Sequence, residues 1–516
     1  WFMYFDFFDS EEELIMLAEV GEEGLALQRK ITEVCTDAGI ALCGPNCMGF
    51  FSPYAKTHGY MMDLLDVGAV KGNVGFVSQS GSVTIAMVSD VSRYGFSHII
   101  SSGNEAVVCT ADYMDYLIDD SYTDVIALFT ETVREPERFV AALDKADRAG
   151  KPVVMLKTGQ SERAASVVQT HTGGLAGTAR ILSAVLKAHR AIEVSNMEEL
   201  AEVLTVCQGK RWPKGRKLGF VTASGGHAEL ILDLAAVKNA EVPPLPSTLR
   251  QKLEDDLGHL PGDGNPVDAW GNGDQNNLKI GLERLSSSGV VDAACLTVDA
   301  GNQEPMGYRS QADPLFYPKM VAEVSSKAKI PLYLLATRHG LKSDSYVREL
   351  KRSGLVNLTG IEPAIFALDS VARFNEPTLP LRIPPADLKK SLASEIDRSS
   401  IHEFDAKKLL ARAGVPTTRE TKVITLEDAK AAANEIGFPV VLKVISDELP
   451  HRTDLGLVMV GIESHETLQA AWSHIEKALE SANLTEQVSE YLVQEMLPNG
   501  VEVLAGIKWE SGYGLQ

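Results

Sequence analysis

Short runs of β-branched and apolar residues alternate with longer amphipathic segments along most of the chain. One stretch runs from NVGFVSQSGS through VTIAMVSDVSRYG to VIALFTE, EPERFVAALDKADRAG and KPVVMLK. Buried strands that alternate with amphipathic helices are typical of a parallel sheet covered by helices on both faces. The pattern therefore predicts an α/β fold built from successive βα units.

An internal repeat divides the middle of the chain into two halves. The segment VGFVSQSGS, which starts at Val74, returns as LGFVTASGG, which starts at Leu218. In each copy an apolar strand ends in a Ser/Gly turn that opens a helix. We therefore expect two related α/β domains, at about residues 70–210 and 215–380, separated by the basic segment GKRWPKGRK.

The segments outside the repeat have different patterns. TLPLRIPPADLKK contains three prolines and reads as an exposed linker. Beyond Ile401, HEFDAKKLLARAG predicts a helix, and GFPVVLKVIS and YLVQEMLP predict strands. EEGLALQRKITEVCTDAGIALCGPNCMGF predicts a helix, a strand and a Gly/Pro turn that end a longer domain. Because the chain begins with Trp1 and ends in GIKWESGYGLQ, we expect both ends to be truncated.

Length and composition narrow the class of protein. The 516 residues suffice for three or four domains. The formal net charge of −21, without a Lys/Arg-rich block, argues against nucleic acid as a partner. No apolar run reaches the roughly 18–20 residues that cross a bilayer, and the aromatic start lacks the basic residues of a signal peptide. Six scattered cysteines are typical of reduced thiols. We therefore expect a cytoplasmic enzyme without a membrane partner.

The two Ser/Gly turns are candidate anion sites. A helix that starts after a strand presents free backbone N–H groups and the positive end of its dipole. A simpler alternative is that small residues only allow tight packing of strand against helix. Duplication favours the anion sites, because two helix starts aimed at one point would hold a doubly charged phosphoryl group. The six residues are Ser80, Gly81, Ser82, Ser224, Gly225 and Gly226.

A histidine and a glutamate are candidates for phosphoryl chemistry. His171 lies among threonines and glycines in SVVQTHTGGLAGT. A neutral imidazole is available as a nucleophile near pH 7, although composition alone favours a surface-loop histidine. Glu131 follows the strand VIALF at the carboxyl end of the sheet, where a carboxylate could orient the imidazole. Its alternative is a solvated charge at the end of a strand.

Two further residues stand out from their surroundings. Lys443 lies inside the apolar strand VVLKVIS, where a buried ammonium needs an anion such as a nucleotide phosphate. The alternative is an edge-strand lysine that faces water. Trp270, in NPVDAWG beside the second turn, could stack on an aromatic acid or hold a sulfonium or ammonium group, or could simply pack.

The order of these motifs resembles a known family. GPNC, VSQSGS, SSGNEA, THTGGLAGT, ASGG and NPVDAWG are followed by FPVVLKVIS, LPHRTDLG, LVQEMLP and GVEV. Together they resemble the ADP-forming acyl-CoA synthetases, relatives of succinyl-CoA synthetase, in their fused single-chain form. The resemblance covers essentially the whole chain and implies five segments. These are the C-terminal part of a Rossmann-like CoA-binding domain (1–69), a flavodoxin-like parallel α/β ligase domain with the phosphohistidine (70–212), a second flavodoxin-like ligase domain (213–380), a linker (381–400) and a truncated ATP-grasp domain (401–516).

Residue roles follow from the resemblance by position. His171 matches the phosphohistidine, Glu131 its orienting carboxylate, and His451 a second histidine that relays phosphate. The two Ser/Gly turns match the helix starts that point at the phosphoryl group. Departures are the absence of the glycine-rich CoA-phosphate turn and of the acidic magnesium ligands, so we expect no metal ligands within the chain. The remaining matches are Asn46 and Cys47 for CoA and Lys443, Glu495 and Glu502 for the nucleotide. Asn104 and Trp270 are candidates for contact with the substrate.

The resemblance implies an acid–thiol ligase that uses ATP, Mg²⁺ and coenzyme A and passes through phosphohistidine and acyl-phosphate intermediates. It also implies a carboxylic acid substrate and a homo-oligomer, a dimer. Two alternatives remain: the catalytic part of a protein acyltransferase relative, or an acyl-CoA-binding module that has lost catalysis. The sequence leaves open whether the acid is acetate-like, a hydroxycinnamate such as ferulate, or a dimethylsulfoniopropionate-type acid. It also leaves open whether His171 swings or is served by His451.

Overall fold

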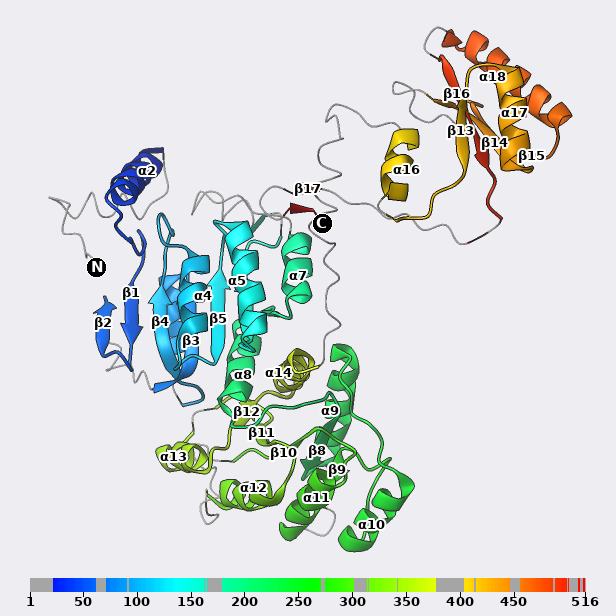
Figure 1. Cartoon of the computed structure of the whole chain (residues 1–516). Helices are drawn as coiled ribbons and strands as arrows, with labels where there is room; N and C mark the ends of the chain where they lie inside the picture. Colours follow the sequence, from blue (N-terminus) through cyan, green and yellow to red (C-terminus); the bar gives the residue numbers. More distant parts are fainter. Residues whose placement is uncertain are drawn as a thin grey trace. The chain divides into compact units, whose positions relative to one another are not determined.

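The chain folds into two compact units, Trp1–Pro377 with Ile507–Gln516, and Thr378–Gly506 (Figure 1). Helices and strands alternate through most of the larger unit, which confirms the predicted α/β class. The computed structural model describes residues 22–61, 71–90, 92–161, 163–164, 179–270, 274–300, 313, 315–340, 342–376, 403–412, 414–445, 455–485, 488–498, 500, 509–510 and 514–515.

The first sheet of the larger unit has seven strands in the order β2-β1-β4-β3-β5-β6-β7. Its five mutually parallel strands have the order 2-1-3-4-5 along the chain, which is the flavodoxin-like order. The parallel strands are β3 (Lys71–Ser78), β4 (Phe96–Ser101), β5 (Val125–Thr130), β6 (Val153–Lys157) and β7 (Ile192–Val194). β1 (Gly49–Ser52) and β2 (Thr57–Tyr60) extend this sheet in antiparallel fashion beyond β4.

Helices lead into and between the strands of this sheet. Their apolar residues face the strands because they recur at the spacing of one helix face, as in α5, where Phe139, Leu143 and Ala146 are buried. The helices are α2 (Glu22–Asp37), α3 (Gly81–Val88), α4 (Thr110–Asp119), α5 (Pro136–Arg148), α7 (Ala179–Ala188) and α8 (Met197–Gln208).

The second sheet of the larger unit repeats the same topology. Its order, β12-β11-β10-β8-β9, is again 2-1-3-4-5 along the chain, and all of its pairings are parallel. The strands are β8 (Leu218–Thr222), β9 (Val267–Asp268), β10 (Ala293–Thr297), β11 (Leu332–Ala336) and β12 (Asn357–Thr359). The helices are α9 (Gly225–Lys238), α10 (Ser247–Leu257), α11 (Asn276–Ser287), α12 (Phe316–Lys327), α13 (Asp344–Ser353) and α14 (Ile361–Phe374).

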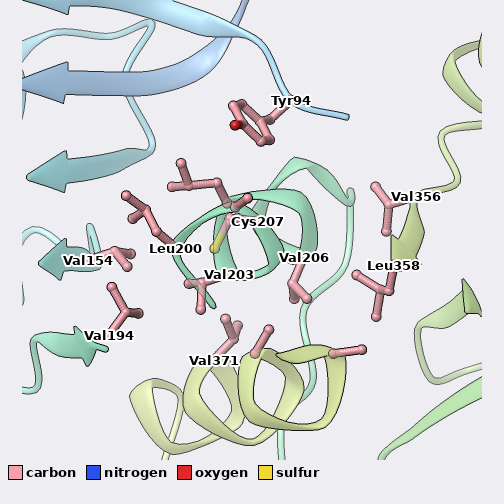
Figure 2. Packing of buried hydrophobic residues seen from close by; sticks show 14 of the residues in the cluster. Tyr94, Val154, Val194, Leu200, Val203, Val206, Cys207, Val356, Leu358 and Val371 are labelled. Atoms are coloured by element: carbon pink, nitrogen blue, oxygen red, sulfur yellow. The ribbon is translucent and has the colours of Figure 1, made fainter. Parts of the chain in front are cut away.

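One hydrophobic core joins the two sheets of the larger unit. Every residue of α8 from Glu199 to Cys207 is buried, as expected of a helix covered on all sides. Figure 2 shows α8 packed beside strand residues Val154 and Val194, with Val371 of α14 close by. Because each fully buried Leu or Val side chain contributes roughly 1.5–3 kcal/mol, this shared core holds the two sheets together.

The smaller unit is a four-stranded antiparallel sheet with a separate core. Its order is β13-β16-β14-β15. Leu442, Val444 and Val493 of the sheet pack with Trp472 and Ile475 of a helix. The strands are β13 (Glu420–Val423), β14 (Val440–Ile445), β15 (Val458–Ile462) and β16 (Glu490–Glu495), and the helices are α16 (Glu403–Arg412), α17 (Leu426–Ile436) and α18 (His465–Ser481). A two-stranded pair, β17 (Trp509–Glu510) with β18 (Gly514–Leu515), lies near the end of the chain.

Two general expectations concern membranes and cysteines. None of the helices in the described part of the chain combines the length and the apolar character that a membrane span requires. All six cysteines are free thiols, as expected, and four of them are buried.

Candidate functional site

The first Ser/Gly turn lies at the point where the strand order of the first sheet reverses. β3 pairs with β4 on one side and with β5 on the other, and α3 starts directly after β3. Open α/β sheets bind ligands beyond the carboxyl ends of the strands at such a point. The Ser80 side chain caps α3 by accepting a hydrogen bond from the Val83 N–H at 3.5 Å, and its Oγ lies 3.2 Å from that of Ser82. The turn is therefore a helix start, as predicted.

Glu131 lies next to this turn, because the side chain of Gln79 connects the ends of β3 and β5. The backbone N–H groups of Glu131 and Thr132 donate to Gln79 Oε1 at 2.7 and 2.9 Å. Gln79 Nε2 in turn donates to the Thr132 carbonyl oxygen at 2.7 Å. These bonds hold the backbone of Glu131 and leave its carboxylate for other partners.

Two basic side chains accompany Glu131. Lys157 Nζ, at the end of β6, donates to the Glu131 carbonyl oxygen at 2.8 Å. Burial lowers the pKa of Lys157, whereas the charge of Glu131 opposes this shift. Burial also lowers the pKa of Arg134, against the charges of Glu105 and Glu131. Positive charge is thus concentrated where a phosphoryl group would add negative charge to that of Glu131.

The GPNC turn packs against the same edge of the sheet. A side chain at Gly81 would place its Cβ 2.7 Å from Met48 Sδ, so the first Ser/Gly turn and the residue after Cys47 are in close contact. At Gly103, which has a φ of +58°, a Cβ would lie 2.3 Å from the Pro45 and Asn46 carbonyl oxygens. Only glycine allows the GPNC turn and the SSGNEA loop to approach this closely.

Asn46 and Asn104 meet through this close approach. Asn46 Nδ2 donates to Asn104 Oδ1 at 3.4 Å, and Asn104 Nδ2 donates to Gln28 Oε1 at 2.9 Å. The Cys47 thiol donates to the Cys43 carbonyl oxygen at 3.5 Å. The structure therefore brings together Asn46, Cys47, Asn104, the Ser80 turn and Glu131, which are far apart in the sequence.

A buried carboxylate at this edge escaped the sequence analysis. Glu105 is only 4% exposed and has a φ of 53°, a strained value for a residue other than glycine. Its carboxylate accepts hydrogen bonds from the hydroxyl groups of Ser102 and Thr110, at 2.7 and 2.6 Å, and from the Thr110 N–H. Burial raises its pKa in spite of these bonds. In the sequence, only its place in the SSGNEA motif indicated a role for Glu105, because a buried glutamate cannot be distinguished there from a solvated loop glutamate.

The second Ser/Gly turn lies at the corresponding point of the second sheet. Ser224 precedes α9 and follows β8, which pairs with β9 and β10. A Cβ at Gly225 would lie 3.3 Å from Asp268 Oδ2, and the Trp270 N–H donates to Asp268 Oδ1 at 3.4 Å. Trp270 is 37% exposed beside this turn. Among the described residues no hydrogen bond joins the Ser80 turn to the Ser224 turn.

In the smaller unit, Lys443 has a carboxylate partner within the chain. Its Nζ donates to Glu403 Oε1 of α16 at 2.5 Å, and its side chain is 14% exposed. β14 pairs on both sides, which rules out an edge-strand lysine. Glu495 instead accepts hydrogen bonds from the Arg419 N–H and Nε, at 2.9 and 2.7 Å.

Lys443 and Glu495 do not meet. Glu495 pairs with Val440, three residues before Lys443 on β14. Because successive side chains of a strand alternate between its faces, an offset of three places the two residues on opposite faces of the sheet. A nucleotide that contacts both Lys443 and Glu495 would therefore have to reach both faces of this sheet.

The ion pair of Glu403 predicts an acid-sensitive smaller unit. Burial opposes ionisation of Glu403, but hydrogen bonds from Lys443 and Lys407 outweigh it and lower its pKa to about 2. The pair therefore stabilises the fold fully above the usual carboxyl pKa of about 4.5, and this contribution is lost as the pH falls toward 2. We expect Glu403→Gln to weaken protection of β14 from hydrogen exchange at neutral pH.

The pH dependence of β14 protection distinguishes the Glu403 ion pair from overall destabilisation of the protein by acid. The difference in β14 protection between wild type and Glu403→Gln should shrink steadily below about pH 4.5. The control is Glu427→Gln on α17, whose ion pair with Lys430 is exposed and contributes little. A difference that stays constant from pH 7 to 3 would contradict the assignment.

Three predicted site residues, His171, His451 and Glu502, lie outside the described residues. Within the described part of the chain, no three His, Cys, Asp or Glu side chains form a group that could hold a metal ion.

Two family models match parts of the chain. Residues 71–207 match the succinyl-CoA ligase like flavodoxin domain, which covers the first flavodoxin-like sheet with its Ser80 turn and Glu131. Residues 392–515 match the ATP-grasp domain, which includes the smaller unit with Lys443 and Glu495.

Curated relatives match almost the whole chain. A 4-hydroxybutyrate–CoA ligase (ADP-forming) of Nitrosopumilus maritimus is 29% identical, over 96% of this chain and 71% of the relative. An acetate–CoA ligase (ADP-forming) of Archaeoglobus fulgidus is 27% identical over the same shares. The solved dinucleotide-forming acetyl-coenzyme A synthetase 1 of Ca. Korarchaeum cryptofilum, with phosphate and ADP, has a similar fold. It is 22% identical with a TM-score of 0.58, over 69% of this chain and 77% of that one.

Proposed function

We propose, from the premise that this chain belongs to the ADP-forming acyl-CoA synthetases, that it joins a carboxylic acid to coenzyme A with ATP as the phosphoryl donor. Enzymes of this family use ATP and coenzyme A and release ADP and phosphate. The observation that carries the proposal is the group of Ser80, Glu131, Asn46 and Cys47 at one switch point of the first sheet.

The reaction has three steps. The γ-phosphoryl group of ATP moves to an imidazole nitrogen of His171, and ADP leaves. A carboxylate oxygen of the acid then takes the phosphoryl group to form an acyl phosphate and regenerate the imidazole. The sulfur of coenzyme A, after losing its proton, attacks the acyl carbon and displaces inorganic phosphate to form the thioester. The protein mainly positions the groups and stabilises their charge.

The residues around Glu131 suit these steps. Its carboxylate would accept a hydrogen bond from the second imidazole nitrogen and stabilise the positive charge of the ring. The start of α3 at Ser80, Gly81 and Ser82 would bind the phosphoryl oxygens through backbone N–H groups. Lys157 and Arg134 compensate the accumulated negative charge. The start of α9 at Ser224, Gly225 and Gly226 is the second anion site of the proposal.

Ligand contacts elsewhere complete the proposal. Asn46, Cys47 and Asn104 would contact the thiol end of coenzyme A and the acid. Lys443, Glu495 and Glu502 would bind the nucleotide, and Lys443 would then exchange Glu403 for a phosphate oxygen. His451 would relay phosphate unless His171 itself swings. We also propose a homodimer, which a measurement of the molar mass by light scattering would test.

The proposed acid supplies the acyl group of the thioester. The names of the relatives include 4-hydroxybutyrate, acetate and trans-feruloyl groups. The exposed Trp270 beside the Ser224 turn would be able to stack on an aromatic acid or hold an onium group. We therefore include short aliphatic, hydroxycinnamic and sulfonium-bearing acids as candidate substrates.

A coupled assay of ADP release tests the function. Full-length protein is supplied with ATP, Mg²⁺ and coenzyme A, and each candidate acid is added in turn. We expect ADP release that depends on both coenzyme A and one class of acid, with the acyl-CoA as product. Acyl-CoA binding without ADP release would indicate a binding module, and acylation of protein lysines would indicate an acyltransferase relative.

A further inference from the structure

A basic pocket lies between the two sheets of the larger unit. It has a volume of about 390 Å³, which is within the range of small-molecule sites. Of the 18 described residues that line it, six are basic and none is Asp or Glu. The basic residues are Lys71, Arg93, Lys210, His339, Lys342 and Lys351.

This charge contrasts with the rest of the chain. In the whole chain, Asp and Glu outnumber Lys and Arg by 70 to 49. A lining without any Asp or Glu therefore differs clearly in composition from the rest of the chain. Arg93 is paired with the buried Glu202 and with Asp90. The other five basic residues come from four places in the chain, since only His339 and Lys342 share a loop, and folding brings them together. Gathering like charges costs free energy unless an anion offsets the repulsion.

Burial adds to this cost. Desolvation lowers the pKa of Lys342, against the charge of Asp299, and it also lowers the pKa of Lys351. Lys210 lies against the end of α13, where a Cβ at Gly354 would be 3.3 Å from Lys210 Nζ. Lys342 is thus partly desolvated, whereas Lys71, Lys210 and Lys351 are exposed around the cavity, so that the charges are close enough together to act jointly on an anion.

The walls of the pocket show which kind of anion fits. Val347, Leu350, Leu355 and Val356 provide an apolar side. The side-chain amides of Gln208 and Asn357 also line it, but both are hydrogen-bonded within the protein, so the charged groups remain to bind a ligand. A purely inorganic ion would leave the apolar side in water, whereas an organic phosphate would cover it and place its charged end on the lysines.

The pocket is distant from the proposed catalytic site in the same sheet. Lys71 is the first residue of β3, whereas Ser80 follows its last residue. A strand of eight residues spans roughly 23 Å, so the two sites lie at opposite ends of the sheet. In the second sheet, the pocket lies along the edge strand β12, from the residues just before it to Thr359, and it includes the loop that follows β11.

We propose that this pocket is a second binding site, separate from the catalytic one, for a phosphorylated organic molecule such as a nucleotide. The ligand contacts both α/β halves, because Lys71 is the first residue of β3 in the first sheet, whereas Lys342 and Lys351 come from the loop after β11 and from α13, which connect strands of the second sheet. Its binding therefore strengthens the packing of one sheet against the other.

Site-resolved lysine labelling tests the location of the site. Full-length protein is acylated with an amine-reactive reagent, with and without millimolar inorganic diphosphate or ADP, and each lysine is followed by mass spectrometry. We expect both probes to slow acylation of Lys210 and Lys351 at least about threefold, with ADP the more effective. Lys187 and Lys252, which are exposed elsewhere, should not change. The proposal would be overturned if Lys210 and Lys351 were not protected, or if Lys187 and Lys252 were protected equally.

A charge-matched pair of variants tests the affinity. In calorimetric titration with inorganic diphosphate, Lys210→Gln with Lys351→Gln should raise the dissociation constant of this site about tenfold or more. Lys187→Gln with Lys252→Gln removes the same charge and should leave it unchanged. The pocket variant should unfold at the same temperature as wild type or higher, because the substitutions remove like charges. Equal affinity in the two variants would show that net charge alone attracts the anion, and would refute a specific binding site in the pocket.

Discussion

Replacing His171 with alanine is expected to abolish the acid-labile label that γ-labelled ATP leaves on the full-length protein. A phosphoramidate on imidazole is stable in base and lost in acid, which distinguishes it from a phosphate ester on serine. The expectation depends on the imidazole being the nucleophile that divides the reaction into two easier displacements. Overall acyl-CoA formation should fall with the label.

Two further histidine variants sharpen this test. His451→Ala should keep the label if His171 swings to the nucleotide, and should lose it if His451 relays the phosphoryl group. His259→Ala, at an exposed position after α10, should keep the label. A label that persists in both His171→Ala and His451→Ala would contradict the proposed mechanism.

Local features of the sequence predicted much of the fold. A Ser/Gly pair after an apolar strand indicates a helix start, because a serine cap and small residues act within one turn. Ser80 and Ser224 both precede helices as expected, although only the Ser80 side chain accepts a capping hydrogen bond. The duplication of these turns also predicted that the two α/β sheets are related, and both have the same strand order.

Side-chain partners between distant segments were beyond the reach of the sequence. Gln79 reads as a polar residue in a turn, yet it connects the ends of two strands through bonds to Glu131 and Thr132. The pairing of Lys443 with Glu403 was equally hidden, because a buried lysine shows that an anion is needed without showing which.

The basic pocket shows the same limit on a larger scale. No block of basic residues exists in the sequence, and the overall charge is negative. Its lysines come from the start of β3, the segment after α8 and the surroundings of α13, and they meet only because the shared core fixes the two sheets. A charge pattern of this kind requires the tertiary structure.

The second large effect is expected from Glu131→Gln, which should lower kcat about 10²- to 10⁴-fold. Glutamine has the same shape, and the hydrogen bond between the residue's N–H and Gln79 involves the backbone, so the fold should be retained. What is lost is the negative charge that would stabilise the imidazolium while the phosphoryl group moves. An amide could also favour the wrong imidazole tautomer, as known for the analogous change in a serine protease triad.

The kinetic pattern separates this role from simple binding. Because Glu131 acts on the imidazole and not on the substrates, the KM values for ATP and coenzyme A should change little while the rate of His171 phosphorylation falls. Glu137→Gln, at an exposed position on α5, removes the same charge close by in the sequence and should keep full activity. A Glu131→Gln enzyme within twofold of wild type would place the carboxylate outside the chemistry, and the buried Glu105 would then be the next candidate at this edge of the sheet.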